Sequence, residues 1–197
     1  MKTRLPASER RAVVLDTACR VFARCSYRGA TTAEIAREAG VTEPILYRHF
    51  DSKQALYLAC LEEAWQRVRT AWEQAVEAER DPRAWTQAMA SAFFEFRRQR
   101  SAVAGLWMQA LTESGDEPEV QAYLRRHLRE VHAFVAGVLR RGQATGMIPA
   151  DRDARAEAWI FIAVGLLTAV ADRLGGLPPG DLQRIRTARR RWLTGEP

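Results

Sequence analysis

Cysteine and lysine are scarce in this sequence of 197 residues. The cysteines, Cys19, Cys25 and Cys60, are odd in number and show no CxxC spacing. They therefore fit the reduced thiols of a cytoplasmic protein better than a disulfide framework. Lysine occurs only at Lys2 and Lys53, and arginine supplies the other 28 of the 30 basic residues.

Motifs of enzyme and metal chemistry are also missing. The glycines form neither a GxGxxG motif nor a Walker loop, and no apparent set of serine, histidine and acidic residue stands out. His127 and His132 lie five positions apart, so they do not share a helix face as metal ligands at i and i+4 do. We expect a protein that is not an enzyme and that holds no cofactor or metal ion.

Long hydrophobic runs are absent as well. The longest uncharged apolar stretch, 158–171, has 14 residues, which is short of the ~20 that cross a bilayer. Residues 1–11 are polar and lack the apolar core of a signal peptide. These features predict a cytoplasmic protein without a membrane partner.

Positive charge is in excess and is unevenly distributed. The net charge is +6 and the sequence pI is about 9.8, which favours an anionic partner such as nucleic acid or an acidic surface. Residues 1–56 hold 10 basic and 6 acidic side chains, and the remainder holds 20 and 18. The first segment therefore has a net charge of +4, against +2 for the rest.

Helical periodicity runs through almost the whole chain, and no segment alternates as a strand does. Apolar residues recur at three- and four-residue spacing between turns marked by glycine and proline. The fold class is therefore predicted to be all-α. The expected helices cover about 7–24, 32–39, 43–50, 52–78, 82–99, 102–112, 118–144, 154–174 and 181–193.

Residues 31–53 predict a helix-turn-helix. Thr31 lies three residues before Glu34, as in a capping box, and Gly40 follows the first helix where a left-handed backbone is usual. Thr42 is a good N-cap for the second helix and Pro44 suits its first turn. A short second helix contributes little to a core but can enter a major groove ~12 Å wide. An ordinary helical hairpin is the alternative.

This segment resembles the DNA-binding domain of the TetR family of bacterial transcriptional regulators. The resemblance rests on Ala18, Phe22, Tyr27, Thr31–Thr32, Ile35–Ala36, Ala39–Gly40–Val41, Leu46–Tyr47, His49–Phe50, Ser52–Lys53 and Leu56. It implies a nine-helix fold, with a helix-turn-helix head at 1–56 and a ligand-sensing and dimerisation domain at 57–197.

The function that the resemblance implies is ligand-responsive regulation of transcription. We expect a repressor that binds a palindromic operator in double-stranded DNA as a homodimer and is released by a small hydrophobic effector. An activator of the same fold is the alternative. A helical-bundle protein or enzyme that binds a small molecule is the alternative from another class.

Nine residues are expected to contact DNA. Thr31 and Thr32 are expected to contact phosphate because they lie at the start of the helix at 32–39, where the backbone amides favour anions. The resemblance implies phosphate contacts from Tyr47, His49 and Lys53 as well, because family members use these positions to contact the DNA backbone. His49 can instead cap the turn. Bases are expected to be read by Thr42, Glu43, Pro44 and Arg48. Arg48 suits guanine or a phosphate, and Glu43 suits a cytosine amino group, unless its carboxylate is only solvated.

The segment departs from the family pattern at three positions. Ser26 stands where the family usually has glycine, and a left-handed serine is strained. Glu43 occupies a position that more often carries a small or basic residue, and Pro44 replaces a common glycine. The base contacts are the part of the prediction that these changes affect.

The helix expected at 154–174 is apolar almost all the way round, which indicates a subunit interface. A central core helix is the alternative. In the family the last two helices form the dimer interface. The candidate interface residues are Trp159, Ile162, Leu166, Leu167, Val170, Ile185 and Trp192.

The family also holds an effector pocket among its middle helices. Large apolar side chains on the corresponding segments are candidates to line it, although each can equally be plain core. No charged residue recurs on these faces, which favours an uncharged effector. The candidates are Trp65, Trp85, Met89, Phe93, Phe96, Trp107, Met108, Leu111, His127 and Val131.

Overall fold

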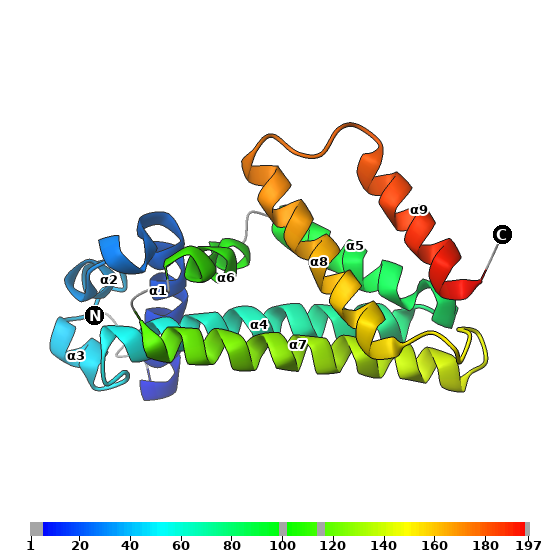
Figure 1. The fold of residues 1–197 in the computed structure, drawn as a ribbon. Coiled ribbons are helices and arrows are strands. Elements are labelled where there is room, and N and C mark those ends of the chain that lie inside the picture. Colours follow the sequence, from blue (N-terminus) through cyan, green and yellow to red (C-terminus); the bar gives the residue numbers. More distant parts are fainter. Residues whose placement is uncertain (1–5, 99–101, 114–116, 196–197) are drawn as a thin grey trace. The chain divides into compact units, whose positions relative to one another are not determined.

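The computed structural model describes residues 6–98, 102–113 and 117–195, which contain nine α-helices, one 3₁₀ turn and no strand (Figure 1). The all-α prediction is confirmed. The elements are α1 (Ala7–Gly29), α2 (Thr32–Glu38), α3 (Glu43–Tyr47), α4 (Lys53–Ala78), η1 (Pro82–Ala84), α5 (Trp85–Arg98), α6 (Ala102–Glu113), α7 (Pro118–Ala144), α8 (Ala154–Arg173) and α9 (Asp181–Thr194).

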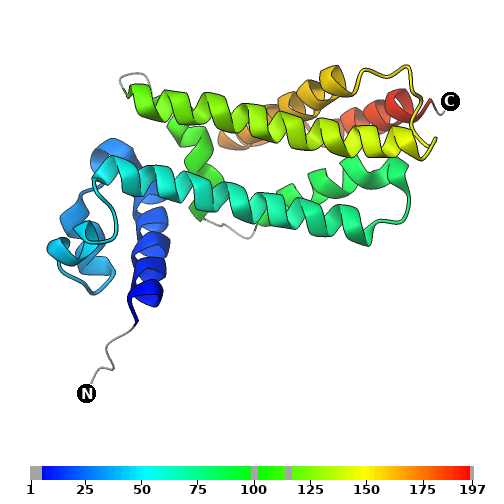
Figure 2. The ribbon, with the colours of Figure 1, turned by 90° about the horizontal axis from the view of Figure 1, so that it is seen from below.

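Two compact units are present. Unit 1 comprises Met1–Val68 and Phe96–Leu124, and unit 2 comprises Arg69–Glu95 and Arg125–Pro197. The two longest described helices, α4 and α7, each have residues in both units, and Figure 2 shows that they run without a break. The functional division expected after residue 56 remains a prediction, because compactness divides the chain at other places.

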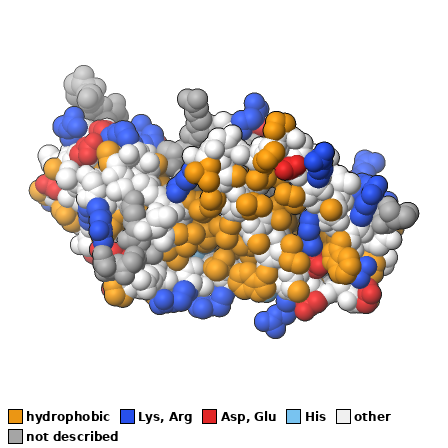
Figure 3. All heavy atoms as spheres, turned by 45° about the horizontal axis from the view of Figure 1, so that its top comes forward, with side chains coloured by type: hydrophobic (Ala, Val, Ile, Leu, Met, Phe, Trp, Pro, Cys, Tyr) orange, Lys and Arg blue, Asp and Glu red, His pale blue; other side chains and the backbone are white. Residues whose placement is uncertain are grey.

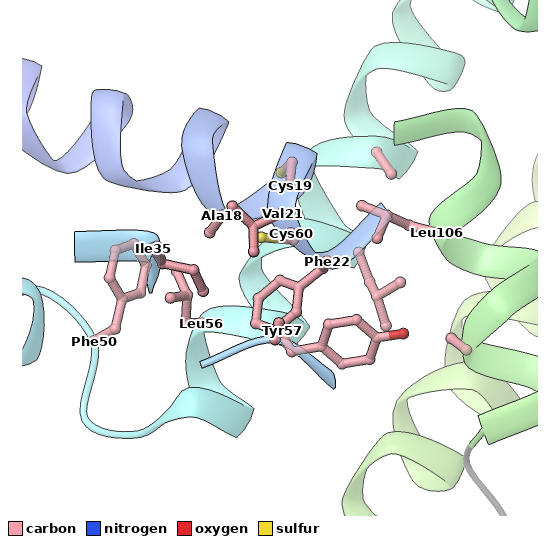
Figure 4. Close-up of a cluster of buried hydrophobic side chains, with 14 of the residues drawn as sticks. Ala18, Cys19, Val21, Phe22, Ile35, Phe50, Leu56, Tyr57, Cys60 and Leu106 are labelled. Atoms are coloured by element: carbon pink, nitrogen blue, oxygen red, sulfur yellow. The ribbon is translucent and has the colours of Figure 1, made fainter. Parts of the chain in front are cut away.

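Unit 1 is built around one hydrophobic core. Phe22 from α1 packs edge-on against Tyr57 of α4, with ring centroids 4.9 Å apart, and Ile35 of α2 lies in the same cluster (Figure 4). Leu46 of α3 is also fully buried in this core. Leu106 of α6 belongs to the same core. The helix-turn-helix therefore shares its core with a helix that the sequence prediction placed in the other domain.

Local capping fixes the turns of unit 1. The Thr31 hydroxyl accepts a hydrogen bond from Glu34 N at 3.1 Å and so caps α2. Gly40 has a φ of +69°, and Val41 N donates to Ala36 O at 2.9 Å, as in a Schellman motif. The Ser52 hydroxyl accepts from Ala55 N at 2.9 Å and so caps α4.

Helix α1 contains a kink at Ser26. This residue has φ 65° and ψ 172°, and it is the one described residue other than glycine with a positive φ. The region is essentially restricted to glycine, and occupying it costs on the order of 1–3 kcal/mol. Ser26 O accepts from Ala30 N, which ends the helix, so the strained residue aims the chain into α2.

Replacing Ser26 with glycine is expected to stabilise the protein. Relief of strain exceeds the ~0.4–1 kcal/mol that glycine adds to the entropy of the unfolded chain. The free energy of unfolding rises by about 1 kcal/mol and Tm by about 2–4 °C, as measured by thermal denaturation. Ser8→Gly in the first turn of α1 is the control, because its serine is in a normal helical conformation, and it is expected to lower Tm. A lower Tm for Ser26→Gly contradicts the assignment of strain.

Unit 2 contains an aromatic cluster centred on Trp72. The indole ring lies 6.4 Å from the ring of Phe93, 5.8 Å from Phe134 and 5.6 Å from Phe161, measured between centroids. These residues come from α4, α5, α7 and α8. The cluster therefore joins α4, α5, α7 and α8 within unit 2.

A buried carboxylate joins α8 to α9. Glu157 is 5% exposed and accepts hydrogen bonds from Arg189 and from Trp192 Nε1, the latter at 2.8 Å. Arg152 lies over the Trp192 ring, with its guanidinium 4.4 Å from the ring centroid, and donates to Trp192 O at 3.0 Å. We call these four residues the Glu157 node.

One face of α8 is apolar and exposed. Its exposed apolar side chains contribute to the orange area over unit 2 in Figure 3. By length and composition α8 is also able to cross a membrane, a test that core helices of soluble proteins pass as well. The exposed apolar residues are Trp159, Ile160, Leu167, Val170 and Leu174.

Candidate nucleic-acid interface

Helix α2 is fastened to α1 by an arginine. Arg24 donates from Nη2 to Glu38 Oε1 at 2.7 Å and to Glu34 Oε1 at 3.0 Å. The hydrogen bond to Glu38 is the largest cause that raises the pKa of Arg24, and Glu34 adds to it. Glu34 thus serves an interhelical ion pair, in addition to its backbone contact with the Thr31 cap.

Helix α3 is buried along one side, and the side chains on its other side are exposed to solvent. Leu46 is its fully buried residue, and the following Phe50 anchors the turn after it. Thr42, Pro44 and Arg48 are exposed, and Tyr47 is 45% exposed. A short helix that is buried along a single row leaves these side chains accessible to a groove.

Thr42 begins α3 as expected, but only through its backbone. It has extended φ and ψ values, and its side chain makes no capping hydrogen bond. The expectation of a side-chain cap is therefore wrong. Pro44 in the first turn pre-sets helical φ and offers no N–H that needs a partner there, so α3 starts without the hydroxyl.

A chain of hydrogen bonds connects α2 with α3. Thr32 Oγ1 donates to Glu43 Oε1 at 2.5 Å and lies 3.2 Å from the Tyr47 hydroxyl. Thr32 is 9% exposed. Two of the expected phosphate contacts, Thr32 and Tyr47, are thus adjacent, and an expected base reader, Glu43, is bonded to one of them.

Lys53 lies over an aromatic ring. Its Nζ is 4.7 Å from the centroid of the Tyr27 ring, an arrangement that attracts a cation to the ring face. Burial lowers the pKa of Lys53, while the Glu117 carboxylate opposes this effect. Burial, with Glu117 and Glu119, raises the pKa of Tyr27, so this ring stays a neutral platform at pH 7.

The remaining DNA candidates lie near these groups in sequence and in unit 1. Thr31 is exposed beside Thr32, and His49 is half-buried in the turn after α3. The His49 backbone N–H closes that turn by donating to Leu46 O at 3.0 Å. Because the backbone already closes the turn, capping by the imidazole is not needed there.

The expected effector residues are divided between the two units. Trp65, Phe96, Trp107, Met108 and Leu111 belong to unit 1, and the other five belong to unit 2. Leu111 is 41% exposed, whereas Met89 and His127 are buried. A common pocket for all ten remains a prediction.

The expected interface residues are not all on the exposed face of α8. Ile162 is only 8% exposed and packs within its own protomer, whereas Leu167 and Val170 are exposed by 45% and 46%. Trp192 is 56% exposed although its indole N–H is bonded to Glu157. The placement of these residues at a subunit interface remains a prediction.

Sequence reasoning also missed several contacts. Phe161 in the aromatic cluster, Arg24 and the Tyr27–Lys53 pair were not identified as positioning groups. The one available signal was the acidic pair Glu34 and Glu38, which share a face of α2 at i and i+4 and so invite a cation. Nothing in the local sequence identifies Arg24 as that cation.

Comparison with known families defines the class of this protein. A model of bacterial regulatory proteins of the tetR family matches residues 14–60. A model of the C-terminal part of BetI-type transcriptional repressors matches residues 82–190, more than half of the chain. The chain belongs to the TetR family, and it is a DNA-binding regulator of transcription.

Two relatives show the range of this family. The transcriptional regulator SrpR of Pseudomonas putida is 30% identical over 171 residues, which cover 86% of this chain and 76% of SrpR. The transcriptional activator FasR of Mycolicibacterium smegmatis is 42% identical over 93 residues, which cover 47% of this chain and 42% of FasR. The match to FasR thus spans less than half of that protein.

A solved structure has the same fold. AibR, in complex with isovaleryl coenzyme A and operator DNA, superposes with a TM-score of 0.65 at 18% identity, over 94% of this chain and 98% of AibR. The AibR structure holds both operator DNA and an acyl coenzyme A.

Proposed function

We propose that this protein is a cytoplasmic repressor without catalytic activity that binds a palindromic operator as a homodimer and is released by a small hydrophobic effector. The observation that carries the proposal is the row of exposed side chains on α3, at Thr42, Pro44, Tyr47 and Arg48. The match of 82–190 to BetI-type repressors supports repression.

The contacts divide into two kinds. Thr31, Thr32, Tyr47, His49 and Lys53 are proposed to hold phosphate oxygens, which fixes the register of the head without reading sequence. Thr42, Glu43, Pro44 and Arg48 are proposed to face base edges in the major groove.

A dimer is required by the operator. Two α3 helices read two half-sites whose centres lie ~34–36 Å apart, or a multiple of that distance. The exposed apolar face of α8, with Leu167 near its middle, is the proposed contact between subunits. Such a face on a DNA-binding protein is best buried against a second copy of itself.

Release is proposed to act through α4 and α6. Because Leu106 of α6 is part of the core that holds α1 and α2, a shift of α6 displaces the head directly. Trp72, Phe93, Phe134 and Phe161 suit an apolar ligand, and AibR binds an acyl coenzyme A. By linkage, effector and operator must weaken each other's binding by the same factor.

The similarity to the activator FasR supports activation as a second candidate. A reporter fused to the gene's own upstream region distinguishes the two functions. Deletion of the regulator gene raises reporter output if the protein represses and lowers it if the protein activates. A thermal-shift screen of hydrophobic compounds, followed by operator-binding assays, then identifies the effector.

The two kinds of DNA contact predict different variant behaviour. Lys53→Ala weakens binding to operator and random duplexes alike, and it reduces the slope of log affinity against log salt concentration by about one. Arg48→Ala costs ~1–3 kcal/mol on the operator alone if it reads a guanine. Fluorescence anisotropy at several salt concentrations measures both effects.

Lys53→Arg is the matched control, because it keeps the charge, and it should retain most of the affinity. Equal losses on operator and random DNA for Arg48→Ala show that Arg48 contacts phosphate. No loss on either DNA for Lys53→Ala removes Lys53 from the interface.

A further inference from the structure

The Glu43 carboxylate consumes the hydrogen-bond donors that a phosphate needs. A threonine hydroxyl carries a single proton, and Thr32 donates it to Glu43 Oε1 at 2.5 Å. Tyr47, 3.2 Å from the same Thr32 oxygen, must then be the donor in that contact. The chain Tyr47 to Thr32 to Glu43 thus ends on an internal anion, and both protons are committed.

DNA and Glu43 therefore compete. For Thr32 and Tyr47 to donate to phosphate oxygens, their protons must turn away from the chain, and the carboxylate must give up its charge-assisted hydrogen bond. A displaced carboxylate that stays near the backbone also repels phosphate. On random DNA no new hydrogen bond to the displaced carboxylate compensates for this loss. Where a cytosine lies opposite, its N4 amino group can donate to the displaced carboxylate.

We propose that Glu43 is a specificity-determining residue that acts as an internal competitor of DNA phosphate. It weakens binding to random DNA more than binding to the operator. This proposal rests on the proposed function, because that function assigns Thr32 and Tyr47 to the DNA backbone. Bonded to Thr32, Glu43 is neither a free base reader nor a solvated charge, and its carboxylate must be displaced before it can read a base.

The test uses Glu43→Gln in the full-length protein. Glutamine keeps the shape and an acceptor oxygen but removes the charge, and charge-assisted bonds are roughly twice as strong as neutral ones. We expect affinity for a random 30-base-pair duplex to rise about tenfold. Affinity for a duplex from the gene's own upstream region should change by less than about threefold, because the easier release of Thr32 is offset there by a weaker, uncharged hydrogen bond to cytosine. The ratio of the two affinities therefore falls.

Asp51→Asn is the matched control. Asp51 is exposed in the same head and carries the same charge, so this variant measures the effect of removing a charge without removing the Thr32 contact. A second variant places Glu43→Gln in a Thr32→Val background. There, Glu43→Gln should raise the affinity for random DNA no more than Asp51→Asn does. Circular dichroism melts verify that each variant is folded.

The proposal is overturned if Glu43→Gln lowers the affinity for random DNA, or raises it no more than Asp51→Asn does. The proposed function fails in a different way: the unmodified protein then binds the upstream duplex no better than the random one. The variant therefore tests this proposal, and the unmodified protein in the same titrations tests the proposed function.

Discussion

Replacing Leu167 with aspartate is expected to convert the proposed dimer into monomers and to abolish tight operator binding. Leu167 is 45% exposed on the apolar face of α8, with Ala163 and Val170 also exposed on either side. A carboxylate buried against a second apolar face loses its hydration without gaining a partner, which costs several kcal/mol. Because one head then contacts one half-site, operator affinity should fall by about 100-fold or more, as each 1.4 kcal/mol is a factor of ten.

Light scattering coupled to size-exclusion chromatography measures the mass, and fluorescence anisotropy measures the affinity. Thr70→Asp, on an exposed position of α4, is the control for an added surface charge and should remain dimeric. If Leu167→Asp proves insoluble, the milder Leu167→Gln gives a concentration-dependent mass. A Leu167→Asp protein with the mass of a dimer moves the interface to another surface.

Removing the carboxylate of the Glu157 node is expected to destabilise the protein strongly. Glu157→Ala leaves the Arg189 guanidinium, whose side chain is 26% exposed, without its anion, and removes the acceptor of Trp192 Nε1. Breaking a buried ion pair on one side costs about 3–5 kcal/mol. At about 2–4 °C per kcal/mol for a chain of this size, Tm should fall by about 10 °C.

Two further variants separate the contributions within the node. Trp192→Phe removes a single neutral donor and should cost about 1 kcal/mol. Glu130→Ala removes the surface pair with Arg126, whose atoms are 3.8 Å apart, and should cost less than ~1 kcal/mol. If Glu157→Ala lowers the free energy of unfolding by less than Glu130→Ala does, the Glu157 node does not hold α9 on α8.

The helix-turn-helix could be predicted because its signals are local. Thr31 bonds Glu34 N three residues away, Val41 bonds Ala36 O five residues away, and Ser52 bonds Ala55 N three residues away. Contacts of this range depend on residue type and spacing, which the sequence displays directly. The strained backbone at Ser26 could be anticipated from the resemblance, because the family usually has glycine at that position.

The faces of α8 could not be predicted. A helix that is apolar all the way round has no polar face to mark its solvent side, so Ile162, Phe161 and Leu167 look equivalent in the sequence. The structure buries Ile162, packs Phe161 against Trp72 and exposes Leu167. Which rows face the core depends on the positions of α4, α5 and α7.

The role of Glu43 also required the fold. Its sequence neighbourhood allowed a base reader or a solvated charge. The structure bonds it to Thr32, eleven residues away, because the turn at Gly40 brings the starts of α2 and α3 together. A hydrogen bond between two helices depends on their relative placement, and residue spacing alone does not specify it.

The sequence by itself determined the order of nine helices, the helix-turn-helix at 31–53 and membership of the TetR family, since periodicity, caps and motif residues act over a few positions. Only the tertiary structure decided that Leu106 completes the core of the head, that Glu157 holds Arg189 and Trp192, and which face of α8 stays exposed. These contacts join residues more than thirty positions apart, and burial of apolar area, which is non-directional, selects them only when the whole chain packs.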